Sequence, residues 1–238
     1  MNDQIKVMYF GPIPERTSCA EFRQRWRQHA RHAMAMPFWR FINRYQHFDA
    51  LAPGERGISE ELYAAVNADR KCGGVGCTWY PDRAALDANL ELYDELQPLL
   101  EDEEETFGRQ LGSDVVPVVE NRVIDRGPAT LTLLSGLWAK PDVGRASFSQ
   151  QWRDMAASLS EYGGVERHLV TYVQNHSLEG FEGRDGLAEY GFASAEALSA
   201  FLAEPKLADW LASGQTDLVV STRKQTIIGA EHTLFDCP

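Results

Sequence analysis

The chain has 238 residues, enough for one large domain or two of ordinary size. Its hydrophobic content of 44% suffices for a sizeable core. Its formal charge of −12 repels phosphate backbones and anionic lipid, so we expect neither nucleic acid nor a membrane as a partner. No apolar run approaches the roughly 20 residues of a membrane-spanning helix. The chain opens without a signal-peptide pattern and its four cysteines form no CxxC pair, which favours a cytoplasmic protein with reduced thiols.

The first segments predict a strand, a helix and a second strand. Residues 5–11 are strand-like and end at a proline-rich turn. A helix is expected to begin after Ser18 as its cap, and it places Phe22 and Trp26 one turn apart on one face. The second strand is expected over 40–47, where aromatic and charged residues alternate.

The next segments predict a third strand, a second helix and a closing strand. The third strand covers 74–80, and the helix after it is capped by Asp82. A closing strand is expected over 115–119, with Pro117 at an edge or a bulge. The order is therefore strand, helix, strand, strand, helix, strand, which is the split βαβ, ferredoxin-like arrangement.

The second half of the chain repeats the same order, at an offset of 126 or 127 residues up to the second strand and of 112 from the third strand on. The first copy carries an insertion at about 49–73 that the second copy lacks. The corresponding segments are a strand over 131–136, a helix with Phe148 and Trp152 capped by Ser147, strands over 167–172 and 186–192, a helix capped by Ser194, and a strand over 226–233.

The repeat predicts two domains, 1–120 and 128–238, with 120–128 as a linker. Strands that are apolar on both faces, such as 7–10, need a cover on each face. Helices cover one face of each sheet, and the sheet of the other copy can cover the second. The predicted fold is α+β, with two tandem ferredoxin-like repeats that pack sheet to sheet as an α+β barrel within one chain.

His29 distinguishes the two copies most clearly. It follows Phe22 and Trp26 on the apolar face of the first helix, whereas the matching position of the second copy holds Met155. A buried imidazole needs a partner or an enclosed cavity. His29 is therefore either a core histidine bonded to a backbone carbonyl or a general acid or base, which its pKa near neutrality suits.

The second strand offers two alternative polar faces. Arg40 and Arg44 lie on one side and would suit a carboxylate, whereas Asn43, Tyr45 and His47 lie on the other and would hydrogen-bond a phenol or carbonyl. The sequence does not decide which side faces a pocket, or whether these residues only border an exposed strand.

The patterns around the remaining candidate residues are less specific. Glu189 stands at about the place of Thr78 in the first copy, inside a strand, and is a secondary candidate. His29 and His32 are spaced as a pair of metal ligands could be, but no further ligands accompany them, so no metal is expected. Arg27, Arg31, His32 and the acidic run 101–105 are assigned to the solvated surface.

The pattern Phe-x-x-x-Trp-x-x-His at Phe22, Trp26 and His29, followed by Arg44 and Tyr45, resembles the EthD-domain family of dimeric α+β barrels. In that family single-domain members pair as homodimers, and the resemblance implies that a tandem member closes the barrel within one chain. Related barrels run cofactor-free decarboxylations, dehydrations, cyclisations and ring oxidations on aromatic or polyketide-like substrates.

Together the residues and the resemblance predict a cofactor-free lyase, of the decarboxylase or dehydratase type, acting on a hydrophobic, aromatic, oxygenated small molecule. His29 moves the proton, and strand tyrosines such as Tyr45, together with Arg44 or Arg40, hold the developing oxyanion. The alternatives are a cofactor-free oxygenase, a haem protein with His29 or His168 as axial ligand, or a non-catalytic binding protein; pairing as a homodimer is left open. The expected substrate contacts are Tyr9, Trp26, Arg40, Asn43, His47, Trp79, Tyr172 and Glu189.

Overall fold

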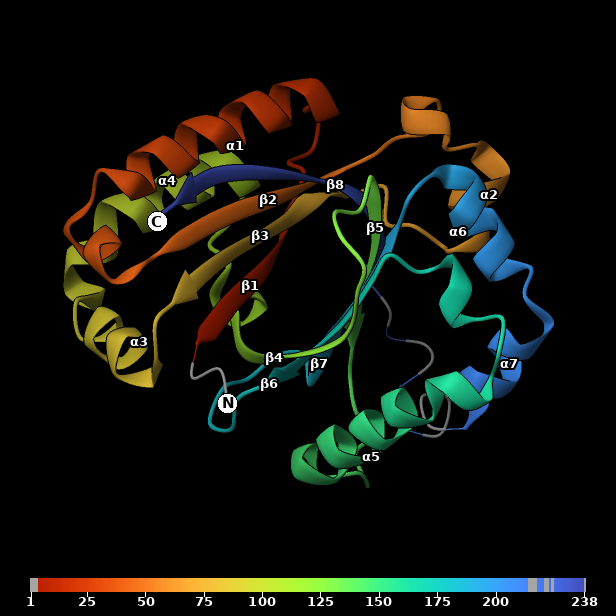
Figure 1. Cartoon of the computed structure of the whole chain (residues 1–238). Helices are drawn as coiled ribbons and strands as arrows, with labels where there is room; N and C mark the ends of the chain where they lie inside the picture. The colour runs from red at the N-terminus through yellow and green to blue at the C-terminus, as the bar shows by residue number, and fades with distance from the viewer. Residues whose placement is uncertain (1–3, 214–217, 221–222, 224, 238) are drawn as a thin grey trace. The chain divides into compact units, whose positions relative to one another are not determined.

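Hydrogen-bonded strands close into an antiparallel barrel. The computed structural model describes residues 4–213, 218–220, 223 and 225–237. Within these residues the strands neighbour one another in the order β1, β3, β2, β8, β5, β7, β6, β4, and β4 returns to β1 (Figure 1). The predicted fold class, an α+β barrel formed by one chain, is confirmed.

The helices and strands follow the predicted repeat. In the first half they are β1 (Ile5–Pro12), α1 (Cys19–Met34), β2 (Arg44–Ala50), α2 (Glu60–Ala65), β3 (Cys72–Tyr80), α3 (Arg83–Leu90), α4 (Gln97–Phe107) and β4 (Val116–Asp125). In the second half they are β5 (Leu131–Leu137), α5 (Arg145–Ala157), β6 (Thr171–Ser177), β7 (Gly186–Phe192), α6 (Ala195–Leu202), α7 (Pro205–Ala212) and β8 (Gln225–Asp236).

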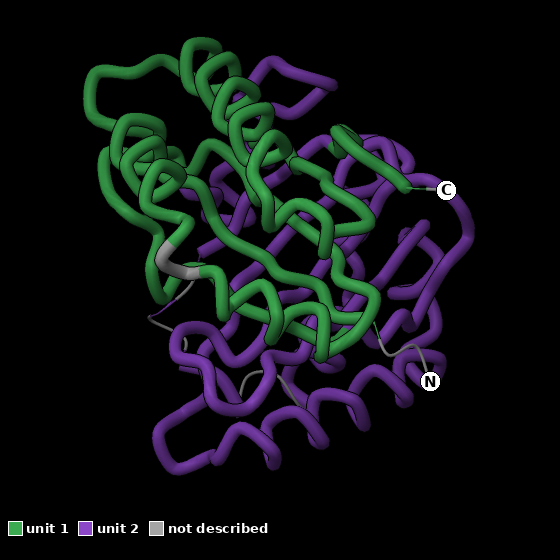
Figure 2. The backbone as a smooth tube through the Cα atoms, turned by 90° about the vertical axis from the view of Figure 1, so that its left-hand side faces the viewer, with its two compact units in different colours: residues 1–50, 70–119, 231–238 green, residues 51–69, 120–230 purple. Residues whose placement is uncertain are grey.

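The chain divides into two compact units that do not coincide with the two halves of the sequence (Figure 2). Unit 1 consists of residues 1–50, 70–119 and 231–238, and unit 2 consists of 51–69 and 120–230. The insertion of the first repeat therefore belongs largely to unit 2, and the last residues of the second repeat belong to unit 1.

Helix α1 covers one face of the sheet in unit 1, with α4 beside it (Figure 1). The predicted cap Ser18 starts α1 with a capping box: its Oγ accepts from the backbone N of Glu21 at 3.3 Å, and the Glu21 carboxylate accepts from the backbone N of Ser18 at 2.9 Å. Phe22, Trp26 and His29 form the buried stripe of the helix, as their spacing predicts.

Glycines in β3 let aromatic rings enter the space beneath α1. A Cβ at Gly76 would lie 2.2 Å from Cζ of Tyr9, and one at Gly73 would lie 2.1 Å from Cε1 of Phe22. Gly76 pairs with Tyr9 on one side and with His47 on the other. Because Gly76 has no side chain, it leaves space on the sheet between the strands of Tyr9 and His47. The Tyr9 ring fills this space.

The segment 51–69 completes the core of unit 2. Ser59 caps α2, its Oγ accepting from the backbone N of Leu62 at 3.1 Å. Leu51, Ile58, Leu62 and Tyr63 are all buried in the apolar cluster that also contains the helix side chains of unit 2. Burial of four apolar side chains makes this insertion a structural part of unit 2.

Four local sequence predictions are wrong. The strand expected over 167–172 begins only at Thr171, after a 3-10 helix over Glu166–His168. The strand expected from Arg40 begins only at Arg44, because Pro37 starts a 3-10 helix over Pro37–Phe41. Residues 120–125 are not a linker, since β4 continues through them and there neighbours β6. Ser147 is not a cap, because α5 already begins at Arg145. Asp82 and Ser194 do cap their helices.

We expect Ile58→Ala to lower the free energy of unfolding by about 2 to 5 kcal/mol, because it leaves a cavity in the core of unit 2. Urea unfolding followed by circular dichroism measures the change. Ala64→Ser, on the exposed side of α2, is the control and should stay within about 0.5 kcal/mol of wild type. Equal stability of the two variants would show that this segment does not pack into the core.

Candidate functional site

Polar aromatic side chains gather in unit 1 on the face of the sheet that α1 covers. Tyr9 on β1, Tyr45 and His47 on β2 and Trp26 on α1 are all buried. The indole Nε1 of Trp26 donates to the Tyr9 hydroxyl at 3.0 Å, and the hydroxyls of Tyr9 and Tyr45 lie 3.0 Å apart. Trp26 also stacks on His47, with ring centroids 3.6 Å apart and planes 12° from parallel.

The two tyrosines remain protonated. Burial raises the pKa of Tyr9 and of Tyr45 above the ordinary value of a phenol. Because the Tyr9 oxygen accepts from Trp26 and only one hydroxyl hydrogen joins the tyrosine pair, the other hydroxyl hydrogen is left for an acceptor outside the pair. The pair is therefore a hydrogen-bond donor in an apolar setting.

His29 is paired with a carboxylate of α4. Its Nδ1 lies 2.6 Å from Oδ2 of Asp102, and the His29 residue is only 4% exposed. Burial opposes ionisation of Asp102, but hydrogen bonds from Arg25, at 2.6 Å, and from His29 bring the pKa of Asp102 below its ordinary value. An ionised carboxylate only accepts, so Nδ1 of His29 carries the proton and its lone pair is on Nε2.

Burial also lowers the pKa of His29, and Asp102 partly offsets this effect. The imidazole is therefore neutral near pH 7, with a fixed tautomer. Phe107 of α4 packs edge-on against the His29 ring with centroids 5.3 Å apart, and it lies 6.0 Å from the Tyr9 ring. Phe107 thus connects the histidine–carboxylate pair to the tyrosines through apolar contacts.

Glu103, the neighbour of Asp102, is buried as well but has a different role. Its carboxylate accepts from the backbone N of Leu111 at 3.0 Å, just after the end of α4. Burial raises the pKa of Glu103, in contrast to that of Asp102. We assign Glu103 to holding the end of α4 in place.

Five of the residues predicted from the sequence come together here: Tyr9, Trp26, His29, Tyr45 and His47. The structure also answers which side of β2 meets α1. Tyr45 and His47 face the helix, whereas Gln46 points the other way and donates to Glu231 at 2.7 Å and Thr233 at 3.0 Å.

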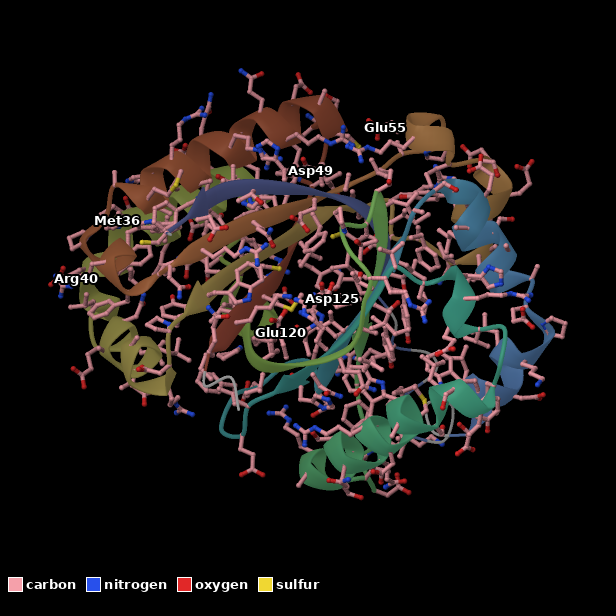
Figure 3. All side chains as sticks on the ribbon, in the orientation of Figure 1. Met36, Arg40, Asp49, Glu55, Glu120 and Asp125 are labelled. Atoms are coloured by element: carbon pink, nitrogen blue, oxygen red, sulfur yellow. The ribbon has the colours of Figure 1, made fainter. Side chains whose placement is uncertain are left out.

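The other predicted residues of unit 1 lie elsewhere. The Arg44 guanidinium lies 4.8 Å from the Trp79 ring, and both belong to the opposite face of the sheet. Asn43 lies at the sheet margin, where its Oδ1 accepts from Gln4 at 3.4 Å. Arg40 lies over its neighbour Phe41 on the 3-10 helix, at the end of β2 remote from Asp49 (Figure 3).

Tyr172 and Glu189 belong to unit 2. Tyr172 stacks on Tyr190 with centroids 4.9 Å apart, and Glu189 accepts from Asn175 at 2.7 Å. The strand register corrects one sequence assignment, because Glu189 pairs with Val173 as Cys77 pairs with Gln46. Glu189 therefore takes the place of Cys77, not that of Thr78.

Sequence reasoning missed Asp102 and Arg27. Asp102 lies in the acidic run that was assigned to the solvated surface, and Arg27 was assigned there too. The Arg27 side chain is only 19% exposed and binds both His47 and Asp49. The sequence did indicate that a buried His29 needs a partner. It does not indicate which carboxylate is that partner.

Comparisons with known proteins support the fold. No protein-family model matches the chain, and no curated protein matches it by sequence. An anthrone oxidase-like protein superposes with a TM-score of 0.58 at 11% identity, over 98% of this chain and 93% of its own. A protein assigned as a chlorite dismutase (TM-score 0.52, 8% identity, 98% and 96% covered) is also similar. A protein of Fusobacterium nucleatum assigned as a monooxygenase gives 0.51 at 9% identity, with 97% and 93% covered.

Two further findings concern the chain as far as the structure describes it. None of its helices combines the length and apolar character needed to cross a membrane. No group of three or more His, Cys, Asp or Glu residues among those described is arranged to hold a metal ion.

We expect Asp102→Asn to lower the pKa of His29 further, because the variant loses the negative charge that favours the imidazolium. NMR titration of the His29 Cε1–H resonance measures this pKa. Asp87→Asn on α3 removes the same charge from an exposed ion pair with Arg83 and serves as the control. A His29 pKa that is unchanged or raised in Asp102→Asn would contradict the pairing.

The free energy of unfolding should depend on pH through His47. Burial, followed by the nearby Arg27 charge, holds the pKa of His47 well below its ordinary value, so the folded protein keeps the ring neutral. In the unfolded chain His47 takes up a proton below about pH 6.5. The stabilisation of the folded state by neutral His47 is therefore complete above that pH and is lost as the pH falls. Between pH 7 and pH 5 the loss from His47 is about 2 kcal/mol.

The variant His47→Gln has no imidazole at this position and should lose less stability over the same range. Urea unfolding at pH 5, 6 and 7 gives both slopes. A wild-type slope equal to that of the variant would mean that His47 is protonated in the folded state.

Proposed function

We propose that unit 1 carries an acid–base centre that removes a proton from a hydrophobic, oxygen-bearing small molecule, with His29 as the base. The observation that carries the proposal is the partly buried hydrogen bond of 2.6 Å between His29 Nδ1 and Asp102. A neutral imidazole whose second nitrogen is held by a carboxylate is a general base with a defined orientation.

Asp102 has two roles in this proposal. It fixes the tautomer that leaves the lone pair on Nε2, and its charge stabilises the imidazolium that forms when Nε2 takes a proton. Arg25 holds the other oxygen of Asp102 at 2.6 Å and keeps this carboxylate ionised. The base is thus ready near pH 7 without a prior change of protonation.

The tyrosine pair would stabilise the substrate oxygen. Tyr9 and Tyr45 stay protonated, and one of their two hydroxyl hydrogens is left for an acceptor outside the pair. A donor aimed at an oxygen that gains negative charge lowers the barrier most effectively in a site that excludes water. Trp26 and Phe107 supply aromatic surface, which favours a substrate with an aromatic ring.

A lyase reaction uses these groups directly. In a dehydration, a C–H proton passes to His29 Nε2, the neighbouring C–O bond breaks, and the imidazolium returns its proton to the departing oxygen as water. This cycle restores neutral His29. A decarboxylation would use the same histidine to move the proton at the carbon that loses carbon dioxide. Arg44, predicted to help hold the oxyanion, has no part in this proposal because it lies on the opposite face of β2.

Oxidation is the second candidate, and the similarity to the anthrone oxidase-like protein favours it. The same proton abstraction gives an electron-rich carbanion or phenolate that can pass electrons to dioxygen. The haem alternative receives no support from His168, because Arg167 and Glu204 both approach its Nε2, at 3.3 and 3.5 Å.

We expect His29→Met to reduce turnover by a factor of about 10² to 10⁴, the range that a general base contributes. Methionine is the residue that the second repeat buries at the equivalent position, so the fold should tolerate it. Two assays separate the candidates: the absorbance change of hydroxybenzoic and hydroxycinnamic acids without oxygen reports lyase activity, and oxygen uptake with anthrone reports oxidation.

His168→Gln, in unit 2, is the matched histidine control and should keep wild-type turnover. Circular dichroism and unfolding curves verify that each variant is folded. A folded His29→Met protein with wild-type rates in whichever assay is active would end the proposal.

A further inference from the structure

His47, the second histidine of the site, is also fixed in place by its neighbours. It is fully buried, its ring is stacked on Trp26 at 3.6 Å between centroids, and the Tyr45 ring meets it edge-on at 4.8 Å. The stacked contact with Trp26 and the edge contact with Tyr45 together fix the plane of the imidazole. The directions of its two nitrogens are therefore fixed as well.

The charges around His47 determine which nitrogen carries the proton. The guanidinium of Arg27 binds Nδ1 of His47, and the same guanidinium pairs with the carboxylate of Asp49. A guanidinium only donates, so Nδ1 must accept. The neutral ring then carries its proton on Nε2, the opposite tautomer to that of His29.

This Nε2–H group is a buried donor with no acceptor among the residues that the structure describes. A buried donor left without a partner costs about 1 to 3 kcal/mol, and such groups are rare in folded proteins. Arg27 and Asp49 nevertheless keep the proton at that position. The donor is thus fixed in position for an oxygen that the described part of the chain does not supply.

We propose that Nε2–H of His47 donates the hydrogen bond to the ligand oxygen that becomes negatively charged when His29 removes a proton. The proposal rests on the proposed function of unit 1 and narrows its substrate class to compounds with a carbonyl or phenol oxygen that turns into an enolate or phenolate. Opposite tautomers give the two histidines complementary roles, one as base and the other as donor.

The second repeat has no unpartnered donor at the position equivalent to His47. Gln174 pairs with Ala188 in β6 and β7 as His47 pairs with Gly76 in β2 and β3, so the two residues are equivalent. The Gln174 amide nitrogen is already used by the backbone oxygen of Trp152 at 2.6 Å and by the Tyr172 hydroxyl at 3.0 Å. At this position the second repeat therefore pairs its donor within the chain, whereas His47 Nε2 has no partner among the described residues.

The test uses ¹⁵N NMR of the histidine rings and the binding of 4-nitrophenol, whose colour reports the phenolate form. In the wild-type protein we expect the His47 proton on Nε2, and we expect that N–H resonance to move when 4-nitrophenolate binds. The phenolate should bind at least about tenfold more tightly than the neutral phenol, since a charged acceptor strengthens the hydrogen bond.

Two variants of His47 separate donation from packing. His47→Phe keeps an aromatic ring against Trp26 but has no donor, so the preference for phenolate should fall about tenfold. His47→Gln introduces the residue of the second repeat, whose amide nitrogen already donates within the chain, so this variant should lose the preference as well. If His47→Phe does not fold, the NMR measurements on the wild type and the binding by His47→Gln decide.

A proton found on Nδ1, an N–H resonance unaffected by the probe, no binding of 4-nitrophenolate, or an unchanged preference in His47→Phe would each overturn the proposal. Because probe binding needs no turnover, it can be measured in the His29→Met protein. A donor that passes these tests while His29→Met keeps its turnover would show that the acid–base function fails and the oxyanion site stands.

Discussion

The structure of unit 1 depends on the need to pair polar groups that are removed from water. Between α1 and its sheet lie indole, phenol and imidazole groups, and each must find a partner in a confined space. Trp26 donates a hydrogen bond to Tyr9, Tyr9 is hydrogen-bonded to Tyr45, and His29 is hydrogen-bonded to Asp102. These bonds set the spacing of α1, α4 and the sheet, so the chemistry and the packing of this region arise from the same contacts.

Much of the fold could be predicted because the chain contains the same unit twice. Side chains that recur, such as Trp26 and Trp152, revealed the helices, and the strands between them followed from their apolar pattern. Boundaries were less predictable where local chemistry competes with the pattern. Pro37 replaces the start of the second strand by a 3-10 helix, and β4 continues through residues 120–125, which were predicted to be a linker.

The candidate site was predictable only in part. His29 could be found because the second repeat has Met155 at its place, but its partner Asp102 lies 73 residues away in a run of acidic residues. A solvated acidic helix end and a helix that turns one or two of its carboxylates inward have nearly the same sequence. Arg27 was missed for a related reason, since an arginine beside a buried tryptophan gives no indication of whether its guanidinium points outward or back along the sheet.

The division into units limits how far the two repeats can be separated. Residues 51–69 of the first repeat fill the core of unit 2, and residues 231–238 of the second repeat belong to unit 1. A gene fragment that encodes one repeat alone would therefore lack part of its own core and expose part of another. We therefore expect that a single repeat cannot form a complete core by itself.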